Sequence, residues 1–200
     1  MTAYATLDDA AQLPDGPASP RVPARSSQTW TEMTRLDPTA VRITFIGVES
    51  LGTLEPLWIE LHHHHKAVAQ MPIEPDDALS WARRVRQYRT LLEAGEGFIL
   101  VAHDGAVPRG YATVEIRDPD DTYGFGGRYA EVVTLGVSEA VRGRGIGSRL
   151  LDHVDAELSR RGVHAQIISV MVGNDGARRL YERRGFRAGE VSLYRPGRMP

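Results

Sequence analysis

The chain has 200 residues, which is enough for one domain with a sizeable core. A formal net charge of −2, with 42% hydrophobic and 25% charged residues, is ordinary for a globular protein and argues against nucleic-acid and polybasic membrane-surface partners. The absence of cysteine excludes disulfides, cysteine-ligated zinc and a thioester formed on the protein itself.

Residues 1–40 differ in composition from the rest of the chain. They combine small and polar residues with no sustained hydrophobic period, and they are interrupted by Pro14, Pro17, Pro20, Pro23 and Pro38. We therefore predict a disordered or loosely packed N-terminal tail over 1–40 and a single domain over 41–200. No apolar run reaches about 18 residues and no secretory signal is visible, so we expect a cytoplasmic location and no membrane association.

The domain opens with a strand, two helices and a hairpin. Apolar and polar residues alternate over 41–47, which is typical of a half-buried strand. Apolar residues at helical spacing predict helices over 53–71 and 76–95, with Thr53 as the N-cap of the first. Two apolar segments joined by a short His-Asp-Gly turn, 98–105 and 109–118, predict the hairpin.

The second half of the domain repeats the alternation of strand and helix. The predicted elements are a polar loop over 119–128, a strand over 129–137, a helix over 147–161, a strand over 164–172, a helix over 174–185 and a last strand over 186–197. This order predicts an α/β or α+β domain, in which a mixed sheet is flanked by helices.

The segment VRGRGIGSRLL, residues 141–151, combines glycines and arginines immediately before a predicted helix. Its glycines are Gly143, Gly145 and Gly147, and its arginines are Arg142, Arg144 and Arg149. Glycines let a ligand approach the main-chain N–H groups, and the arginines indicate that this ligand is an anion. The alternative interpretation is a flexible turn with solvated arginines.

Two familiar phosphate-binding loops do not match this segment. A Walker A loop requires a lysine near its end, whereas the only lysine of the chain, Lys66, lies in another predicted helix. The dinucleotide fingerprint requires three glycines in the first strand-to-helix turn. Here the segment comes late in the chain, and Leu150 occupies the third glycine position counted from Gly145.

A third type of loop matches together with a second motif. RGRGIG fits the pattern R-x-x-G-x-G between a strand and a helix, and NDGARRLYERRGFR carries Asn174, Ala177, Tyr181, Gly185 and Phe186 in the expected pattern. On these motifs and the element order, the sequence resembles the GNAT superfamily of acyl-CoA-dependent N-acyltransferases. The resemblance implies a mixed, mostly antiparallel sheet with a splayed strand pair.

The resemblance also implies the binding residues for acetyl-CoA, the expected acyl donor. The pyrophosphate would be held by Arg142, Gly143, Arg144, Gly145, Ile146, Gly147 and Ser148. Main-chain groups of Leu135, Gly136 and Val137 would contact the thioester and pantetheine, with a strand bulge at Gly136. Asn174 would bind the pantetheine arm or a water, or serve as a helix N-cap.

Two catalytic roles follow from the same resemblance. Tyr181 is two helical turns after Asn174, on the same face, and would be the general acid at the CoA sulfur. Glu131 is the candidate general base, with Glu115 as second choice. The alternative is that Glu131 is a solvated glutamate at the end of a strand and that the amine is deprotonated through water.

The run of four histidines at 62–65 does not match a metal motif. Only His62 and His65 share a helix face, and no acid in the run completes a ligand set, so we expect no metal. The resemblance implies that this helix and the next wall the acceptor pocket, where one or two of the histidines would lie. An excess of acids over 43–127 favours a cationic amine as acceptor.

The sequence thus predicts an N-acetyltransferase that moves an acetyl group from acetyl-CoA to a primary amine by direct attack in a ternary complex. The expected acceptor is a small molecule, and the expected assembly is a monomer or homodimer. Two alternatives stay open. One is an N-acyltransferase that uses a longer acyl-CoA, and the other is a CoA-binding regulatory module without transferase activity.

Overall fold

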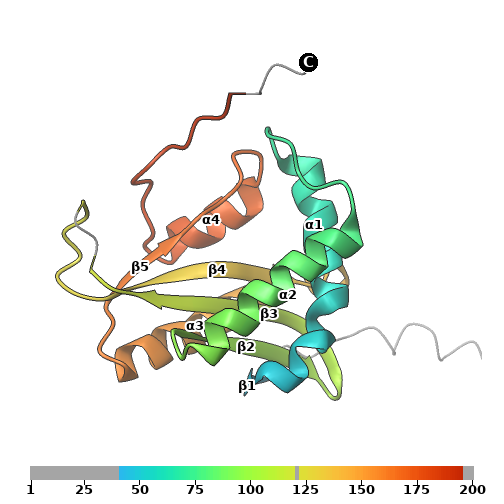
Figure 1. Ribbon diagram of the computed structural model, residues 1–200, viewed down its shortest axis with the longest axis horizontal. Helices are drawn as coiled ribbons and strands as arrows, with labels where there is room; N and C mark the ends of the chain where they lie inside the picture. Colours follow the sequence, from blue (N-terminus) through green and yellow to red (C-terminus); the bar gives the residue numbers. More distant parts are fainter. Residues whose placement is uncertain (1–40, 120–121, 196–200) are drawn as a thin grey trace, which may run out of the picture. The chain divides into compact units, whose positions relative to one another are not determined.

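Five strands form one sheet in the order β1-β2-β3-β4-β5 (Figure 1). The computed structural model describes residues 41–119 and 122–195, so the predicted tail lies outside the described residues. Strands β1 to β4 run antiparallel, and β5 runs parallel to β4. The strands are β1 Arg42–Ile46, β2 Gly97–Asp104, β3 Val107–Arg117, β4 Tyr129–Val137 and β5 Ala165–Ile168. The predicted mixed, mostly antiparallel sheet is confirmed.

In the described part of the chain, four α-helices and two short 3₁₀ segments surround the sheet. They are η2 Val48–Leu54, α1 Glu55–Val68, α2 Asp77–Glu93, η3 Glu139–Val141, α3 Ile146–Arg160 and α4 Asp175–Arg183. Side-chain oxygens of Asp76 and Asn174 accept N–H groups in the first turns of α2 and α4, as good N-caps do. Thr53 is not an N-cap, because its hydroxyl donates to the Ser50 carbonyl within η2.

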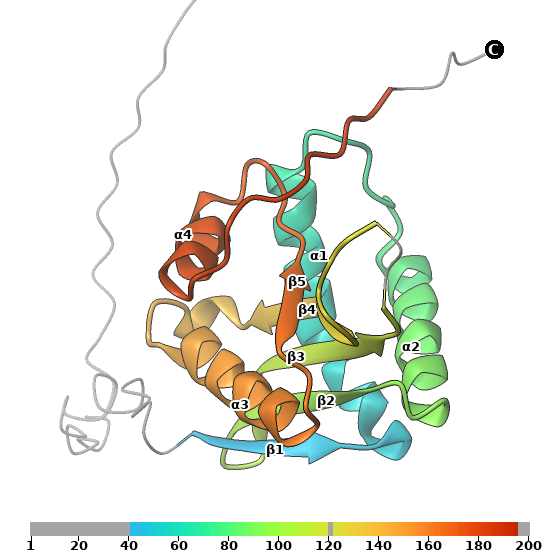
Figure 2. The same cartoon turned by 90° about the vertical axis from the view of Figure 1, so that its left-hand side faces the viewer.

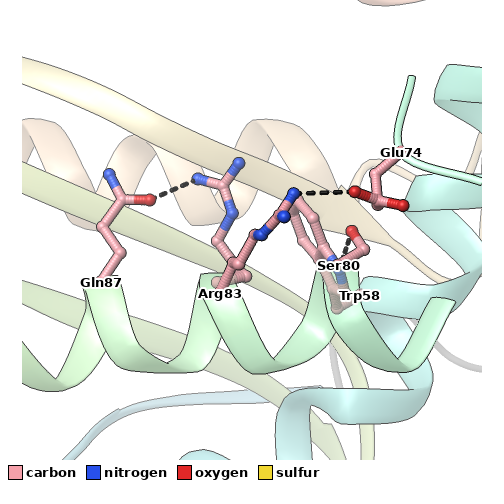
Figure 3. Close-up of a pocket in the computed structure, with 6 residues that line it drawn as sticks. Trp58, Glu74, Ser80, Arg83 and Gln87 are labelled. Carbon is pink, nitrogen blue, oxygen red and sulfur yellow. Dashed lines mark hydrogen bonds and ion pairs between the residues drawn. The ribbon is translucent and has the colours of Figure 1, made fainter. Parts of the chain in front are cut away.

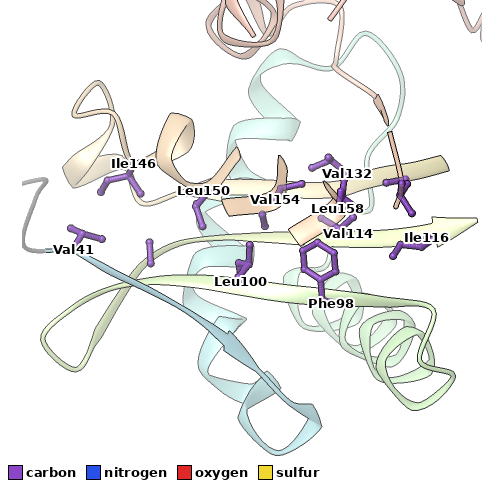
Figure 4. Close-up of a cluster of buried hydrophobic side chains, with 14 of the residues drawn as sticks. Val41, Phe98, Leu100, Val114, Ile116, Val132, Ile146, Leu150, Val154 and Leu158 are labelled. Carbon is purple, nitrogen blue, oxygen red and sulfur yellow. The ribbon is translucent and has the colours of Figure 1, made fainter. Parts of the chain in front are cut away.

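Helices α1 and α2 cover one face of the sheet, and α3 covers the other (Figure 2). The α1–α2 pair is joined by Trp58, whose indole N–H donates to the Ser80 hydroxyl at 3.2 Å (Figure 3). On the opposite face, α3 buries Ile146, Leu150, Val154 and Leu158 against β2, β3 and β4 (Figure 4). Each such side chain contributes about 1.5–3 kcal/mol, so α3 and the loop before it are firmly attached to the sheet.

Strand β4 carries a bulge at Val133. Thr113 of β3 lies opposite Thr134, whereas its neighbour Val114 lies opposite Val132, so Val133 is the extra residue. The prediction of a bulge at Gly136 is therefore wrong. Gly136 has a packing role instead, because a β-carbon there would lie 3.1 Å from the Tyr111 ring.

The bulge coincides with the point where β5 separates from β4. Pairing between the two strands covers only Tyr129–Val132 of β4. The strand predicted over 164–172 is consequently shorter, since residues beyond Ile168 have no partner on β4. The strand predicted over 186–197 is also wrong for the described part, 186–195, where Val191 and Leu193 are exposed and no residue pairs with the sheet.

Candidate functional site

The separation of β5 leaves an open edge on β4. Beyond Val132 the main chain of β4 has no strand partner on that side within 41–119 and 122–195. The Ser138 N–H bonds to the Arg109 carbonyl on β3 at 2.9 Å. Main-chain groups alternate along a strand, so Leu135 and Val137 direct theirs toward the open edge.

The third predicted contact of this strand, Gly136, behaves differently. By the same alternation its main-chain groups face β3, and its carbonyl oxygen lies 2.8 Å from where a β-carbon of Gly110 would be. The Val137 carbonyl already accepts the Arg142 Nε–H at 3.1 Å. Of these three residues, Leu135 thus has the main-chain N–H and C=O groups that are most accessible to a ligand.

The glycine loop between η3 and α3 has the backbone that its composition predicts. Gly143 and Gly145 have φ of 75° and 81°, in the left-handed region that favours glycine. No atom of the described residues lies within 4 Å of a β-carbon built at either glycine, so these residues leave the space in front of the loop open. Gly147 has another role, because its β-carbon would lie 3.3 Å from Leu180 of α4 and 3.8 Å from Val137 of β4. Helix α3, helix α4 and strand β4 therefore meet at Gly147.

The first turn of α3 completes an anion-binding arrangement. The N–H groups of Ile146, Gly147 and Ser148 come at the positive end of the helix dipole and lack partners within the helix. Arg142 is exposed beside them, and Arg144 is half-buried. Open space, main-chain donors and positive charge together fit a diphosphate.

Glu60 of α1 holds the start of this loop and was missed by sequence reasoning. Its carboxylate accepts the Ser138 hydroxyl at 3.1 Å and the Glu139 N–H at 2.8 Å. The contact fixes the end of β4 relative to α1 across nearly eighty residues of sequence. No sequence signal marks Glu60, because only the fold brings it next to Ser138 and Glu139.

Tyr181 lies in α4 with its ring almost fully buried. The residue is 8% exposed, and its ring packs edge-on against Phe186 at 6.0 Å between centroids. Burial raises the pKa of Tyr181 to about 12, so the hydroxyl is protonated at neutral pH. Among the described residues the hydroxyl has no hydrogen-bond partner, which leaves its proton available to a ligand.

Asn174 combines its cap with a position beside α1. Its Oδ1 accepts the Ala177 N–H at 3.1 Å, so the predicted N-cap is confirmed. The preceding Gly173 approaches the end of α1 so closely that a β-carbon would lie 2.5 Å from the Val68 carbonyl. Helix α4 is anchored to α3 as well, through Arg184, which pairs with Asp152 and Asp155.

Glu131 is held in an ion-pair group on the face that carries α1 and α2. Arg117 Nη2 lies 2.6 Å from the Glu131 carboxylate and 2.8 Å from the Glu115 carboxylate. Glu115 and Glu131 are directly opposite each other in the β3–β4 register. The structure thus brings together both candidate bases, and their common partner leaves the group with one excess negative charge.

Three buried hydroxyls lie under the bulge. The Tyr88 hydroxyl contacts the Thr134 hydroxyl at 2.7 Å and the Tyr111 hydroxyl at 3.2 Å. Burial raises the pKa of both tyrosines, which keeps them neutral. This cluster joins α2 to the bulged part of β4, so α2 supports the geometry of the open edge.

The histidine run has mostly structural contacts. His62 is 2% exposed and bonds the Glu74 carbonyl at 2.8 Å and the Ser80 hydroxyl at 3.3 Å. His63 bonds Asp77 at 2.6 Å. The ring of His65 packs edge-on against Trp58, and burial, followed by the charges of neighbouring histidines and Arg84, lowers its pKa to about 4.

The lowered pKa of His65 predicts how stability depends on pH. Unfolding returns the pKa to 6.5, so between pH 6.5 and 4 the unfolded chain binds more protons and the free energy of unfolding falls as the pH falls. We expect His65→Gln to flatten this dependence between pH 6.5 and 4.5, measured as melting temperature. His164→Gln, at an exposed position, is the control. An unchanged slope in His65→Gln, or an equal change in both variants, would contradict the assignment.

The described residues form neither a metal site nor a membrane-spanning helix. Within 41–119 and 122–195, no group of three or more His, Asp or Glu side chains is arranged to hold a metal ion. None of the helices described in these ranges is long and apolar enough to cross a membrane.

One protein family matches most of the domain. Residues 58–186 match the model of the acetyltransferase (GNAT) family. The chain belongs to the GNAT acetyltransferase family. The glycine loop, the open edge of β4 and α4 all lie within the matched range. No curated protein sequence matches the chain.

Solved structures share the GNAT fold at low sequence identity. The tetramutant of the BH1408 protein from Bacillus halodurans is 17% identical, with a TM-score of 0.67 over 78% of this chain and 99% of that one. A GCN5-related N-acetyltransferase from Ralstonia eutropha JMP134 is 18% identical, with a TM-score of 0.60 over 78% and 97%. A predicted acetyltransferase from Clostridium acetobutylicum, solved with acetyl-CoA, is 16% identical, with a TM-score of 0.60 over 78% and 96%.

Proposed function

We propose that this GNAT protein transfers an acetyl group from acetyl-CoA to a primary amine by direct attack within a ternary complex. The observation that carries the proposal is the convergence of three elements at Gly147: the open edge of β4, the glycine loop before α3, and α4 with Tyr181. The lack of cysteine supports direct attack over a cysteine-bound acyl group. The structure solved with acetyl-CoA supports the choice of donor.

The binding roles follow from the contacts of this chain. Main-chain N–H groups of the loop and the first turn of α3 would bind the diphosphate, with Arg142 and Arg144 adding positive charge. Leu135 would pair its main-chain groups with the pantetheine amides along the open edge. Acetyl-CoA supplies the activated acyl group, and these contacts would hold its carbonyl beside the bulge at Val133.

The chemical roles concern two protons. The amine nitrogen forms a bond to the acyl carbon as the carbon–sulfur bond breaks, and Tyr181 donates its proton to the departing sulfur. The phenolate then recovers a proton from solvent. Glu131 accepts the proton that the amine loses, directly or through water, while Arg117 orients its carboxylate.

The proposal is tested by release of free thiol from acetyl-CoA in the presence of a broad panel of primary amines. We expect release that requires an amine and yields the acetylated amine. Faster release from butyryl-CoA would favour the alternative of a longer acyl donor. A rise in melting temperature with acetyl-CoA, without thiol release for any amine, would favour a CoA-binding regulatory module.

The base assignment predicts a pH-dependent defect. We expect Glu131→Gln to lower kcat/KM near neutral pH and to approach the parent protein at high pH, where a lysine-like amine, with a pKa of about 10.4, needs no base. Glu115→Gln is the matched control, because it removes the other carboxylate bound to Arg117. A deficit in Glu131→Gln that is independent of pH would assign Glu131 to structure or substrate binding. A pH-dependent deficit confined to Glu115→Gln would move the base to Glu115.

A further inference from the structure

A pocket between α1 and α2 takes no part in the steps above. It has a volume of about 190 Å³ and is open to solvent. Its walls come from α1, from the segment before α2 and from α2 itself (Figure 3). The lining residues are Trp58, Glu74, Ser80, Arg83, Arg84 and Gln87. The pocket thus combines an aromatic side chain with two guanidinium groups, and ligand sites use such combinations of apolar and polar groups.

The two arginines of the pocket differ in their partners. Arg83 is neutralised by Glu74, whose carboxylate lies 2.7 Å from its Nη1. Arg84 has no carboxylate within 4 Å among the described residues. Its guanidinium lies 4.3 Å from the centre of the Trp58 ring and donates to the Gln87 side-chain oxygen at 3.0 Å. The stacked ring and this hydrogen bond orient the Arg84 charge without cancelling it.

The other described groups near Arg84 do not supply the missing negative charge. His65, which packs on the same tryptophan, is neutral at pH 7 because its pKa is lowered to about 4. His62 is bonded to the Glu74 carbonyl and to Ser80. Asp77 is bonded to His63 and Lys66. The residues that line the pocket therefore carry one excess positive charge, which fits an anionic group.

One buried side chain, Tyr88, contacts both Arg84 and the strand beside the bulge. The Arg84 guanidinium carbon lies 5.8 Å from the centre of the Tyr88 ring, and the Tyr88 hydroxyl reaches Thr134, next to the bulge. Leu91, two turns beyond Arg84, packs beside Gly97, which is opposite Glu115 in the sheet. Along α2, the positive charge of Arg84 thus comes first. The contact of Tyr88 beside the bulge follows, and the end near the negatively charged Glu115–Arg117–Glu131 group comes last.

We propose that Arg84 binds a carboxylate of the acceptor, so that the acetylated amine belongs to an amino acid or another molecule with a free carboxylate. This inference rests on the proposed function. A guanidinium binds a carboxylate through two parallel N–H donors, and the acidic group at the other end of α2 attracts the amine. A simple diamine would place a second cation against Arg84, so the structure favours a zwitterion over the purely cationic acceptor expected from composition.

The first test uses amines in pairs that differ only by a carboxylate: L-lysine and cadaverine, L-tyrosine and tyramine, β-alanine and ethylamine. We expect thiol release with the carboxylate-bearing member favoured by about 10-fold or more in kcat/KM for the pair that fits. Arg84→Met should remove the preference, whereas Arg86→Met, exposed on the same helix and outside the pocket, should keep it. Equal use of both members of each pair, or a preference retained in Arg84→Met, would overturn the subsite and leave the transferase intact.

A second readout needs no turnover. The indole N–H of Trp58, assigned with Trp58→Phe, is followed by NMR during titration with the same six amines in the presence of CoA. We expect a saturable shift with the carboxylate-bearing members only, lost in Arg84→Met. A shift without thiol release would keep the subsite and reject the transferase. No shift with any carboxylate up to about 10 mM would reject the subsite.

Discussion

Gly145→Glu is expected to abolish binding of acetyl-CoA. Residue 145 is the N-cap of α3, with φ of 81°, and among the described residues the space beyond its Cα is open in the direction that a diphosphate would occupy. A glutamate there fills that space, brings a negative charge toward the phosphates and strains the left-handed backbone. The rise in melting temperature that acetyl-CoA produces in the parent protein should disappear in this variant.

The chain offers a matched control for this substitution. Gly105 in the β2–β3 turn also has positive φ, 60°, and nothing lies within 4 Å of a β-carbon built there. Gly105→Glu therefore introduces the same charge and a similar backbone strain far from the loop in sequence. We expect it to lower stability to a similar extent while keeping the full acetyl-CoA shift. A full shift in Gly145→Glu as well would show that the donor does not bind at this loop.

Tyr181→Phe is expected to lower kcat by roughly 10- to 1000-fold, the scale of lost general-acid assistance. The substitution removes one hydroxyl and keeps the ring that packs against Phe186, so the melting temperature and acetyl-CoA affinity should change little. Because the pKa of Tyr181 is about 12, the parent enzyme should also show no loss of rate from deprotonation of this acid below about pH 10.

The control for the missing hydroxyl is Tyr123→Phe. That side chain is exposed and its hydroxyl bonds Glu190, so kcat should be unaffected. Full turnover by Tyr181→Phe on a confirmed acceptor would remove the acid role. A large loss of acetyl-CoA binding in this variant would instead assign the hydroxyl to donor binding.

The sequence by itself was sufficient for features that depend on neighbouring residues. Left-handed φ at Gly143 and Gly145 follows from the absence of a β-carbon, and the start of α4 follows from the side-chain oxygen of Asn174. Each needs only a few consecutive residues, so spacing and residue type predict it. The order of strands and helices up to α4 is predictable for the same reason.

Other features were decided by tertiary contacts. The bulge lies at Val133 rather than at Gly136, because the register of β3 against β4 sets it. A strand forms only by pairing with a neighbour, and residues 186–195 pair with no strand of the sheet, although β5 is at its edge. The pairing of Glu131 with Arg117 and the unneutralised charge of Arg84 over Trp58 are likewise invisible in the sequence. These properties depend on which residues of distant segments are brought together, and hydrophobic periodicity carries no information about charged side chains that meet only in the fold.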